Sequence, residues 1–339
     1  MTVLAGDDPA AIEHAADRLA AGALVAFPTE TVYGLGARAD DDAAVARIFA
    51  AKGRPADHPL IVHVASIESA LHFAPRPGAA AQALMAALWP GPLTVIVPRH
   101  PARAAAAAGG QPSIGLRMPA HPVALALLRA CAARGVAGLA APSANRFGRV
   151  SPTTAAHVAA EFGADLLVLD GGACAVGIES AIVDCTGVPP ARPALLRPGQ
   201  IGRARIEAVL GAPLAARAAG APRASGTLEA HYAPRAPVRL FAHDELAARV
   251  AAPPAPMPAG AWVAVYSRLV PAAGWRHRPM PDDAAAAARE LFAVLRAFDD
   301  QGAAAIWVEQ PPAQPGWEGV HDRLRRAAAS APAARCGEP

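Results

Sequence analysis

The sequence predicts an α/β protein with a second, smaller domain of βαβ type, and three observations support this fold class. Short β-rich runs alternate with amphipathic helical runs along most of the chain. The 339 residues are enough for two domains of ordinary size. A stretch rich in Ala, Pro, Arg and Gly, at 212–237, has no sustained hydrophobic period and is typical of a linker.

In the first part of the chain we expect strands in short apolar runs between turn residues, and helices where apolar residues recur every three or four positions. The expected strands are 23–27, 60–64, 93–97, 113–117, 136–141, 166–169, 180–184 and 194–197. The expected helices are 8–21, 41–51, 79–88, 122–134, 153–162 and 203–210. In the helix at 41–51, Val45, Ile48 and Phe49 form one apolar face, and the aspartates at its start complement the helix dipole.

The alternation resumes after the linker. There the expected strands are 238–241, 262–266 and 304–308, and the expected helices are 244–250, 282–298 and 320–329. Strands that alternate with helices in this way favour a small sheet of βαβ type.

Composition and charge exclude several classes of protein. The net charge of +3 permits an anionic substrate or an occasional RNA contact, but it is no nucleic-acid signature by itself. The cysteines form no CxxC pair and have no histidine cluster near them, so we expect no zinc site; they are Cys131, Cys174, Cys185 and Cys336. Because we find neither a secretory leader nor a membrane-spanning apolar stretch, we expect a cytoplasmic protein with no membrane contact.

Two residues stand out because their types are otherwise missing. The chain has 31 Lys and Arg residues together, yet Lys52 is the only lysine, and Asn145 is the only asparagine. The abundance of Ala, Arg, Pro and Gly indicates codon pressure against both types. An ammonium point charge on a flexible stem cannot be replaced by Arg, and Asn offers a donor and an acceptor together. Lys52 and Asn145 are therefore candidates for chemistry.

Five polar segments carry the candidate sites, and the first runs from Phe27 to Gly36. It leaves the end of an expected strand, where ligands bind in α/β sheets, and enters a Gly-spaced turn. Its hydroxyl groups come from Thr29 and Thr31. Taken alone, an ordinary strand-to-loop exit explains this segment equally well.

The second segment begins with Lys52 and Arg54, which follow a helix and can converge on one polyanion. It continues through His58 to His63, and the density of polar groups favours a site over satisfied core histidines. The third segment ends an uncharged strand with Arg117, which is suited to a carboxylate or a phosphate.

The fourth segment, at 141–153, combines a hydroxyl and amide loop with Ser151 ahead of an expected helix. Ser151 fits an anion site and a plain N-cap equally well. The fifth segment places Glu179 and Ser180 at the start of a strand, and Arg197 ends the next strand.

These five segments, in this order, resemble the YrdC-like family, and specifically its two-domain threonylcarbamoyl-AMP synthases. The resemblance implies a YrdC-like catalytic domain at 6–202, a linker at 203–237 and a small α/β, Rossmann-like domain at 238–330. For the first domain it implies a twisted mixed sheet with flanking helices and a large cleft. The linker run from His231 to Pro234 and the ending from Trp317 to Leu324 are similar to the family as well.

The resemblance implies a reaction of L-threonine, bicarbonate and ATP that gives threonylcarbamoyl-AMP and pyrophosphate. A separate tRNA-modifying transferase complex then uses the product, and weak contact with tRNA is expected. The implied threonine-binding residues are Thr31, His63, Arg117, the backbone at Ala141, and Ser180. The implied ATP-binding residues are Arg54, His58, Ser113, Ser143, Ser151, Arg197 and, from the linker, Tyr232.

Catalysis is assigned by the resemblance to Lys52 and Arg54, which would offset the charge that develops as pyrophosphate leaves. Mg²⁺ would arrive with ATP, with no metal ligands from protein side chains. Whether Lys52 touches the phosphates or holds the loop that does so stays open. The family pattern usually has Thr where this chain has Ala181, so we expect one hydroxyl contact to be missing.

Two alternatives compete with this interpretation. Carbamoyltransferases of hydrogenase maturation share the catalytic domain, but they carry paired CxxC motifs that this chain lacks. An RNA-binding module with the same basic cleft would show no ATP turnover and a salt-dependent affinity for tRNA.

Overall fold

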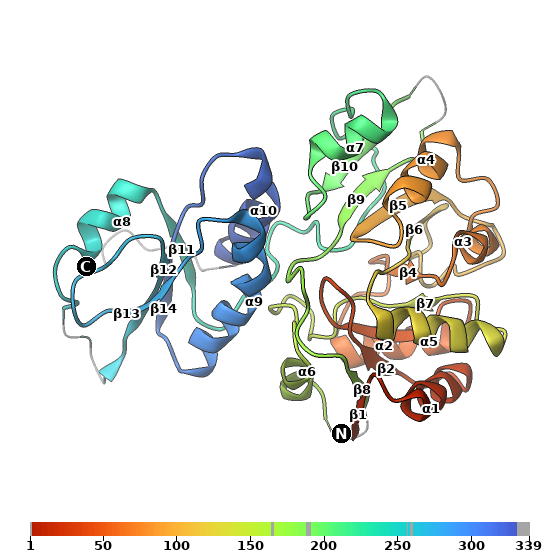
Figure 1. The fold of residues 1–339 in the computed structure, drawn as a ribbon, viewed down its shortest axis with the longest axis horizontal. Coiled ribbons are helices and arrows are strands. Elements are labelled where there is room, and N and C mark those ends of the chain that lie inside the picture. The colour runs from red at the N-terminus through yellow and green to blue at the C-terminus, as the bar shows by residue number, and fades with distance from the viewer. Residues whose placement is uncertain (1, 164–165, 188–190, 256, 258–259, 331–339) are drawn as a thin grey trace. The chain divides into compact units, whose positions relative to one another are not determined.

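The computed structural model describes residues 2–163, 166–187, 191–255, 257 and 260–330 (Figure 1). Cys336 therefore lies outside the described residues. The described chain divides into two compact units. The first holds the residues up to Phe147 and those from Ser151 to Thr227, and the second holds Gly148–Val150 and the residues from Leu228 on. The boundary at 227/228 falls inside the stretch that the sequence marks as a linker.

The first unit alternates strands and helices as an α/β protein should. Its strands are β1 (Thr2–Ala5), β2 (Val25–Phe27), β3 (Gly34–Arg38), β4 (Ile61–His63), β5 (Leu93–Pro98), β6 (Ser113–Arg117), β7 (Leu139–Ala140), β8 (Leu167–Asp170), β9 (Ala181–Asp184) and β10 (Ala194–Arg197). Its helices are α1 (Pro9–Ala20), α2 (Asp42–Lys52), α3 (Ile67–Phe73), α4 (Ala79–Leu88), α5 (Pro122–Ala133), α6 (Ala155–Glu161) and α7 (Arg203–Leu210).

All ten of these described strands join one sheet, in the order β1-β8-β2-β3-β7-β4-β6-β5-β9-β10. The pairing is mixed, since β4 and β6 run parallel whereas β5 and β6 run antiparallel. The predicted α/β class, with a mixed sheet and flanking helices, is thus confirmed.

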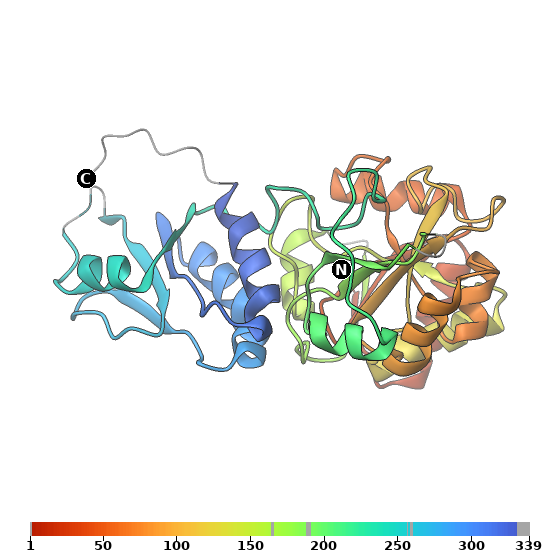
Figure 2. The same ribbon diagram turned by 90° about the horizontal axis from the view of Figure 1, so that it is seen from above.

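Helices cover the two faces of this sheet unequally. One face packs against α2, α3, α4, α6 and α7 through a core that includes Ile48, Phe73 and Leu84. On the other face α1 and α5 pack together over the half of the sheet that holds β2, β7 and β8. The helices of both groups are labelled in Figure 1, and Figure 2 gives a view of the same ribbon from above.

The remaining half of that second face, over β4, β6, β5 and β9, is covered by linker instead of a helix. Ile96 and Ile182 project from it, and the linker residues Ala215, Ala221 and Ala224 pack against them. Because no described helix fills this area, polar side chains on it can face a ligand.

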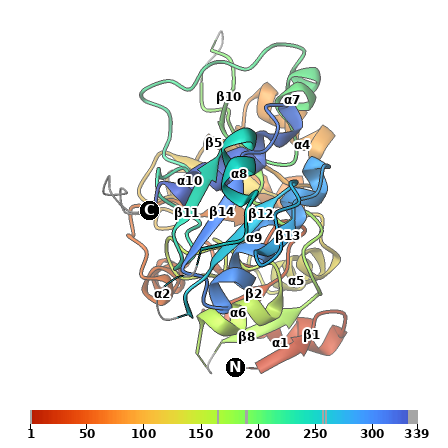
Figure 3. The same ribbon diagram turned by 90° about the vertical axis from the view of Figure 1, so that its left-hand side faces the viewer.

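The second unit is a smaller α/β body. Its strands are β11 (Val238–Phe241), β12 (Val263–Ser267), β13 (Arg276–Pro279) and β14 (Ala305–Glu309). Its helical elements are α8 (His243–Val250), α9 (Ala284–Asp300), the 3₁₀ turn η2 (Pro315–Trp317) and α10 (Glu318–Ala328). The strands are all parallel, in the order β11-β14-β12-β13, which Figure 3 shows from the front. Parallel strands joined by helices confirm the predicted βαβ type.

The sequence missed three strands and one α-helix, namely β1, β3, β13 and α3, as well as the 3₁₀ turn η2. The strand β3 was predicted as a Gly-spaced turn, because Gly34 and Gly36 lack the side chains that mark a strand. A side chain at Gly36 would come within 2.8 Å of the Phe27 ring, so this strand needs glycine to pack. In the described chain, no helix is long and apolar enough to cross a membrane.

Candidate active site

Strand register places two of the predicted threonine-binding residues, His63 and Arg117, on one sheet face. His63 of β4 pairs with Arg117 of β6. On the other side of β6, Thr94 of β5 lies opposite Arg117, because the neighbouring residues Val95 and Leu116 are paired. Next in line, Thr94 pairs with Ile182 of β9. Since side chains alternate across a sheet, these residues share the face that the linker covers.

Arg117 is the centre of the buried polar network on this face. Its Nη1 donates to Thr31 Oγ1 at 2.9 Å, and its Nε donates to the carbonyl of Gly91 at 3.2 Å. Its Nη2 lies 2.7 Å from Glu30 Oε1 in an ion pair. Thr31 is fixed in turn by Thr29, whose Oγ1 is 2.8 Å from Thr31 Oγ1. The structure therefore brings Thr31 and Arg117 into direct contact.

His63 is a neutral group at this site. Burial, reinforced by the positive charge of Arg117, lowers its pKa to about 3. Its ring meets Phe27 edge to face, with the centroids 6.2 Å apart. A buried imidazole that stays uncharged can donate or accept a hydrogen bond at neutral pH, but it cannot supply a positive charge.

Ser180 and Arg197 form a second cluster, next to Thr94. Ser180 Oγ and Thr94 Oγ1 share a hydrogen bond of 2.7 Å. Arg197 donates from Nε to the Ser180 carbonyl at 3.0 Å and from Nη2 to Ser180 Oγ at 3.2 Å. The third nitrogen of Arg197 donates to the carbonyl of the linker residue Ser225 at 2.8 Å. Arg197 thus connects the sheet to the linker.

Lys52 contacts a loop that lies far from it in the sequence. It ends α2, and the left-handed Gly53 that follows turns the chain away. The Lys52 ammonium group is buried and donates to the Ser143 carbonyl at 2.6 Å and to the Asn145 carbonyl. Burial, helped by nearby Arg54, holds the pKa of Lys52 well below its ordinary value. The only lysine therefore holds the loop with the only asparagine.

Arg54 and His58 meet at Phe147, near the same loop. The guanidinium of Arg54 lies 5.8 Å from the centre of the Phe147 ring and donates to the Pro59 carbonyl at 3.0 Å. The His58 ring lies 5.5 Å from that of Phe147. Burial, together with Arg54, lowers the pKa of His58. These contacts fix a cation beside the loop that Lys52 holds.

Ser151 is not an N-cap, so that alternative is wrong. The helix α6 starts at Ala155, and its N-cap is Thr154, whose side chain accepts from the His157 amide. Ser151 is buried instead, and its hydroxyl donates to Glu179 Oε1 at 2.5 Å. A buried hydroxyl bound to a buried carboxylate fits a site better than a helix end.

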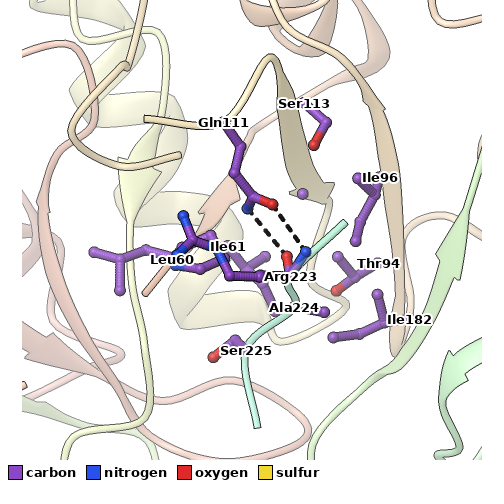
Figure 4. Close-up of a pocket in the computed structure, with 12 residues that line it drawn as sticks. Leu60, Ile61, Thr94, Ile96, Gln111, Ser113, Ile182, Arg223, Ala224 and Ser225 are labelled. Carbon is purple, nitrogen blue, oxygen red and sulfur yellow. Dashed lines mark hydrogen bonds between the residues drawn. The ribbon is translucent and has the colours of Figure 1, made fainter. Parts of the chain in front are cut away.

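Ser113 lines a pocket on the linker-covered face (Figure 4). The pocket has an empty volume of about 280 Å³, including space open to solvent, and Thr94 and Ile182 form part of its wall. The linker closes one side, where the amide of Gln111 exchanges two hydrogen bonds with the backbone of Arg223, at 2.8 and 3.1 Å. Arg223 also pairs with Asp57 at 2.8 Å.

Two alanines were part of the sequence predictions. Ala141 was expected to bind threonine through its backbone, and Ala181 was expected to lack a hydroxyl contact. The amide of Ala141 donates to the Ile61 carbonyl at 3.0 Å, which fixes this backbone beside β4. Ala181 packs into the hydrophobic core on the opposite face from Ser180. A threonine at this position would direct its side chain to that core, so the expected loss of a site contact is wrong.

Tyr232 belongs to the second unit. It is buried, its ring stacks on Phe292 with the centroids 5.4 Å apart, and Arg323 lies over it at 5.5 Å. Its φ of 61° lies in the left-handed region, which packing must hold in place for a residue other than glycine. Its contact with ATP stays a prediction.

Sequence reasoning missed Glu30 and Thr94, and it gave Glu179 no role. Glu30 lies in the first polar segment, between Thr29 and Thr31. A signal for Thr94 existed too, because it is the one hydroxyl in an otherwise apolar strand. Among the described residues, no group of three or more His, Cys, Asp and Glu side chains is placed to hold a metal ion.

Taken together, the mixed sheet and the buried Arg, His, Lys and hydroxyl groups define an α/β protein whose site suits a small anionic ligand. The family model for Sua5, YciO and YrdC, described as telomere recombination, matches residues 17–199. A second model, described as the C-terminal domain of threonylcarbamoyl-AMP synthase, matches residues 201–329. The chain belongs to the Sua5/YciO/YrdC family and carries the C-terminal domain found in threonylcarbamoyl-AMP synthases.

Individual relatives agree with this assignment. Threonylcarbamoyl-AMP synthase of Pyrococcus abyssi is 44% identical over 233 residues, which cover 67% of this chain and 66% of the relative. The enzyme of that name from Bacillus subtilis is 42% identical over 243 residues, which cover 70% of this chain and 68% of the relative. The crystal structure of P. abyssi Sua5 complexed with L-threonine superposes with a TM-score of 0.84 at 36% identity, covering 97% of each chain.

Proposed function

We propose that this chain is a threonylcarbamoyl-AMP synthase, a nucleotidyltransferase that makes threonylcarbamoyl-AMP and pyrophosphate from L-threonine, bicarbonate and ATP. This synthesis is the first step of threonylcarbamoyladenosine formation in tRNA. The observation that carries the proposal is the alignment of His63, Arg117 and Ser180 on one sheet face, in a chain of this family.

In the proposed complex, Arg117 holds the threonine carboxylate by a charge-assisted pair, and Thr31, His63, Ser180 and the Ala141 backbone surround the rest of the amino acid. The threonine ammonium group gives up a proton to water, and its nitrogen then adds to carbon dioxide with loss of a further proton, or to bicarbonate with loss of water. An oxygen of the resulting carbamate attacks the α-phosphorus of ATP and displaces pyrophosphate. The chain offers positioning and electrostatic stabilisation for this step, with no covalent nucleophile required.

The ATP would lie against Arg54, His58, Ser113, Ser143, Ser151 and Arg197, with Tyr232 as a further contact. Arg54 would stabilise the charge on departing pyrophosphate directly. Lys52 would act through the loop it holds, because its ammonium group already donates to two carbonyls there. Mg²⁺ would enter bound to the phosphates of ATP. We place the reaction in the cytoplasm, where a downstream transferase complex would use the product to modify tRNA.

The decisive measurement is pyrophosphate release by the purified full-length chain. We expect release that requires ATP, L-threonine and bicarbonate together, with mass-spectrometric detection of threonylcarbamoyl-AMP. Reactions without threonine, or in bicarbonate-depleted buffer, are the controls. Release in the absence of both would contradict the proposal. No release at all, combined with tRNA affinity that falls steeply with salt, would favour an RNA-binding module.

A further inference from the structure

Glu30 is a buried carboxylate to which the proposed reaction gives no task. Its side chain is 11% exposed, and Oε1 lies 2.7 Å from Arg117 Nη2. Neither of its carboxylate oxygens accepts a hydrogen bond of ordinary geometry in the described chain. Buried carboxylates usually accept several hydrogen bonds, so the remaining acceptor capacity of Glu30 is available to a ligand.

Ionisable side chains from three segments of the chain surround Glu30. Arg117 at the end of β6 is the cation in contact with it. His121, just before α5, feels the charge of Glu30, but burial still lowers its pKa below the ordinary value. On the third side, burial and the charge of Glu30 raise the pKa of the Cys174 thiol to about 12, so that it stays neutral. One cation and one anion therefore dominate this part of the site.

We propose that Glu30 binds the α-ammonium group of the substrate amino acid while Arg117 binds its carboxylate. The inference rests on the proposed function, which places the threonine carboxylate on Arg117. A second carboxylate on this Arg would lie within a few ångströms of Glu30 and would repel it. An ammonium group on the adjacent carbon removes that conflict, because the four charges then alternate in sign.

Glu30 is thus a specificity residue, which selects amino acids over hydroxy acids of the same shape. An acid without the ammonium group brings a negative charge to Arg117 and leaves Glu30 facing it without compensation. Rejection by an unpaired buried charge is a stronger device than a small difference in pocket shape.

The test compares wild type with Glu30→Gln, which keeps the shape of the side chain and removes its charge. Glu68→Gln is the matched control, because Glu68 is an exposed residue of α3 outside the site. Isothermal titration of the full-length chain measures binding of L-threonine and of 2,3-dihydroxybutanoate of matching configuration, in which a hydroxyl replaces the ammonium group. Circular dichroism and thermal unfolding check the fold of each variant.

We expect Glu30→Gln to weaken L-threonine binding by roughly 30-fold or more, which corresponds to the truncation of one partner of a buried charge pair. The same variant should bind the hydroxy acid more tightly than wild type does. In steady-state assays KM for threonine should rise while kcat is not lowered, because the contact with the ammonium group exists in the bound ground state and is given up when the nitrogen loses its proton and becomes that of the carbamate. A purely structural role would lower stability and kcat without reversing the ligand preference.

The proposal is overturned if Glu30→Gln binds L-threonine within threefold of wild type, or if its preference between the two ligands is unchanged. If Glu30→Gln does not fold, Glu30→Asp replaces it. That variant keeps the charge, so it should weaken threonine binding and still reject the hydroxy acid, and acceptance of the hydroxy acid would refute the idea. Threonine-dependent pyrophosphate release by wild type is measured separately, so failure of the proposed activity is distinguishable from failure of this inference.

Discussion

Replacing Lys52 by methionine tests whether the buried ammonium group acts by holding the loop at Ser143 and Asn145. The change keeps an unbranched side chain of similar length and removes all three donors. Hydrogen bonds from a charged donor contribute about 1.5–3 kcal/mol each, so the two bonds of Lys52 tether the loop by about 3–6 kcal/mol. Burying the ammonium group costs several kcal/mol, which the variant recovers.

These opposing terms predict different effects on stability and on turnover. The net change in the free energy of unfolding should stay within about 2 kcal/mol, since tether loss and relief of desolvation nearly cancel. Without these two hydrogen bonds, the ordered form of the loop is destabilised by about 3 kcal/mol relative to its other forms. This lowers the population of the ordered loop, and with it the rate of adenylate formation, by about 100-fold. The assays are pyrophosphate release at saturating substrate and unfolding in guanidinium chloride.

Arg47→Met is the matched control, because Arg47 lies on the same helix and donates to a single carbonyl, that of Gly22, at 2.6 Å. It should leave turnover within about twofold of wild type, as expected for a cation outside the site. Turnover of Lys52→Met within threefold of wild type would refute the reasoning. So would a stability loss of more than about 4 kcal/mol, which would make Lys52 chiefly a structural residue.

Two further predictions concern buried charges. The pKa of His63 is about 3 in the folded chain, against about 6.5 when unfolded, so the unfolded state binds more protons and stability falls as pH drops below about 6.5. His63 alone should cost about 1.4 kcal/mol between pH 7.5 and 5.5, and denaturant titrations should show His63→Gln losing that much less than wild type over this range; equal losses would contradict the assignment. In the second unit, buried Asp322 pairs with Arg323 at 3.0 Å and with Arg326 at 2.8 Å. Asp322→Ala should lower the free energy of unfolding by about 3–5 kcal/mol, because two buried arginines lose a carboxylate that pairs with their charge, and a change below about 1 kcal/mol in chemical denaturation would show that these ion pairs contribute little.

Local sequence patterns predicted most of the fold because hydrophobic periodicity reports which residues face a core. The strand Ser113–Arg117 and the helices Ala79–Leu88 and Arg203–Leu210 have the predicted bounds. The pattern failed where burial gave no periodic signal. In β3, two glycines replace the side chains that would mark a strand, and only β7 residues Leu139 and Ala140 of the predicted run 136–141 pair in the sheet.

The candidate site divides in a similar way. Each polar segment was visible in the sequence, since hydroxyls, cations and glycines at strand ends are unusual enough to notice. Their mutual contacts were not, because register decides which strands meet. Thr94 became part of the site only when β5 was paired between β6 and β9. The role proposed for Glu30 depends on its contact with Arg117, which lies 87 positions later in the chain and whose Nη2 is 2.7 Å from Glu30 Oε1.

The sequence alone determined the class of protein and the ordered motifs, and it marked a solitary lysine as a candidate, because these depend on residue types and on spacing along the chain. The tertiary structure decided the partners. It placed Lys52 on the carbonyls of a loop 91 and 93 residues away, and it directed Ala181 into the core while its neighbour Ser180 faces the site. It also gave Ser151 a carboxylate partner in place of a helix end. The physical reason is that contacts between distant segments depend on sheet register and burial, and neither is encoded in any single local stretch.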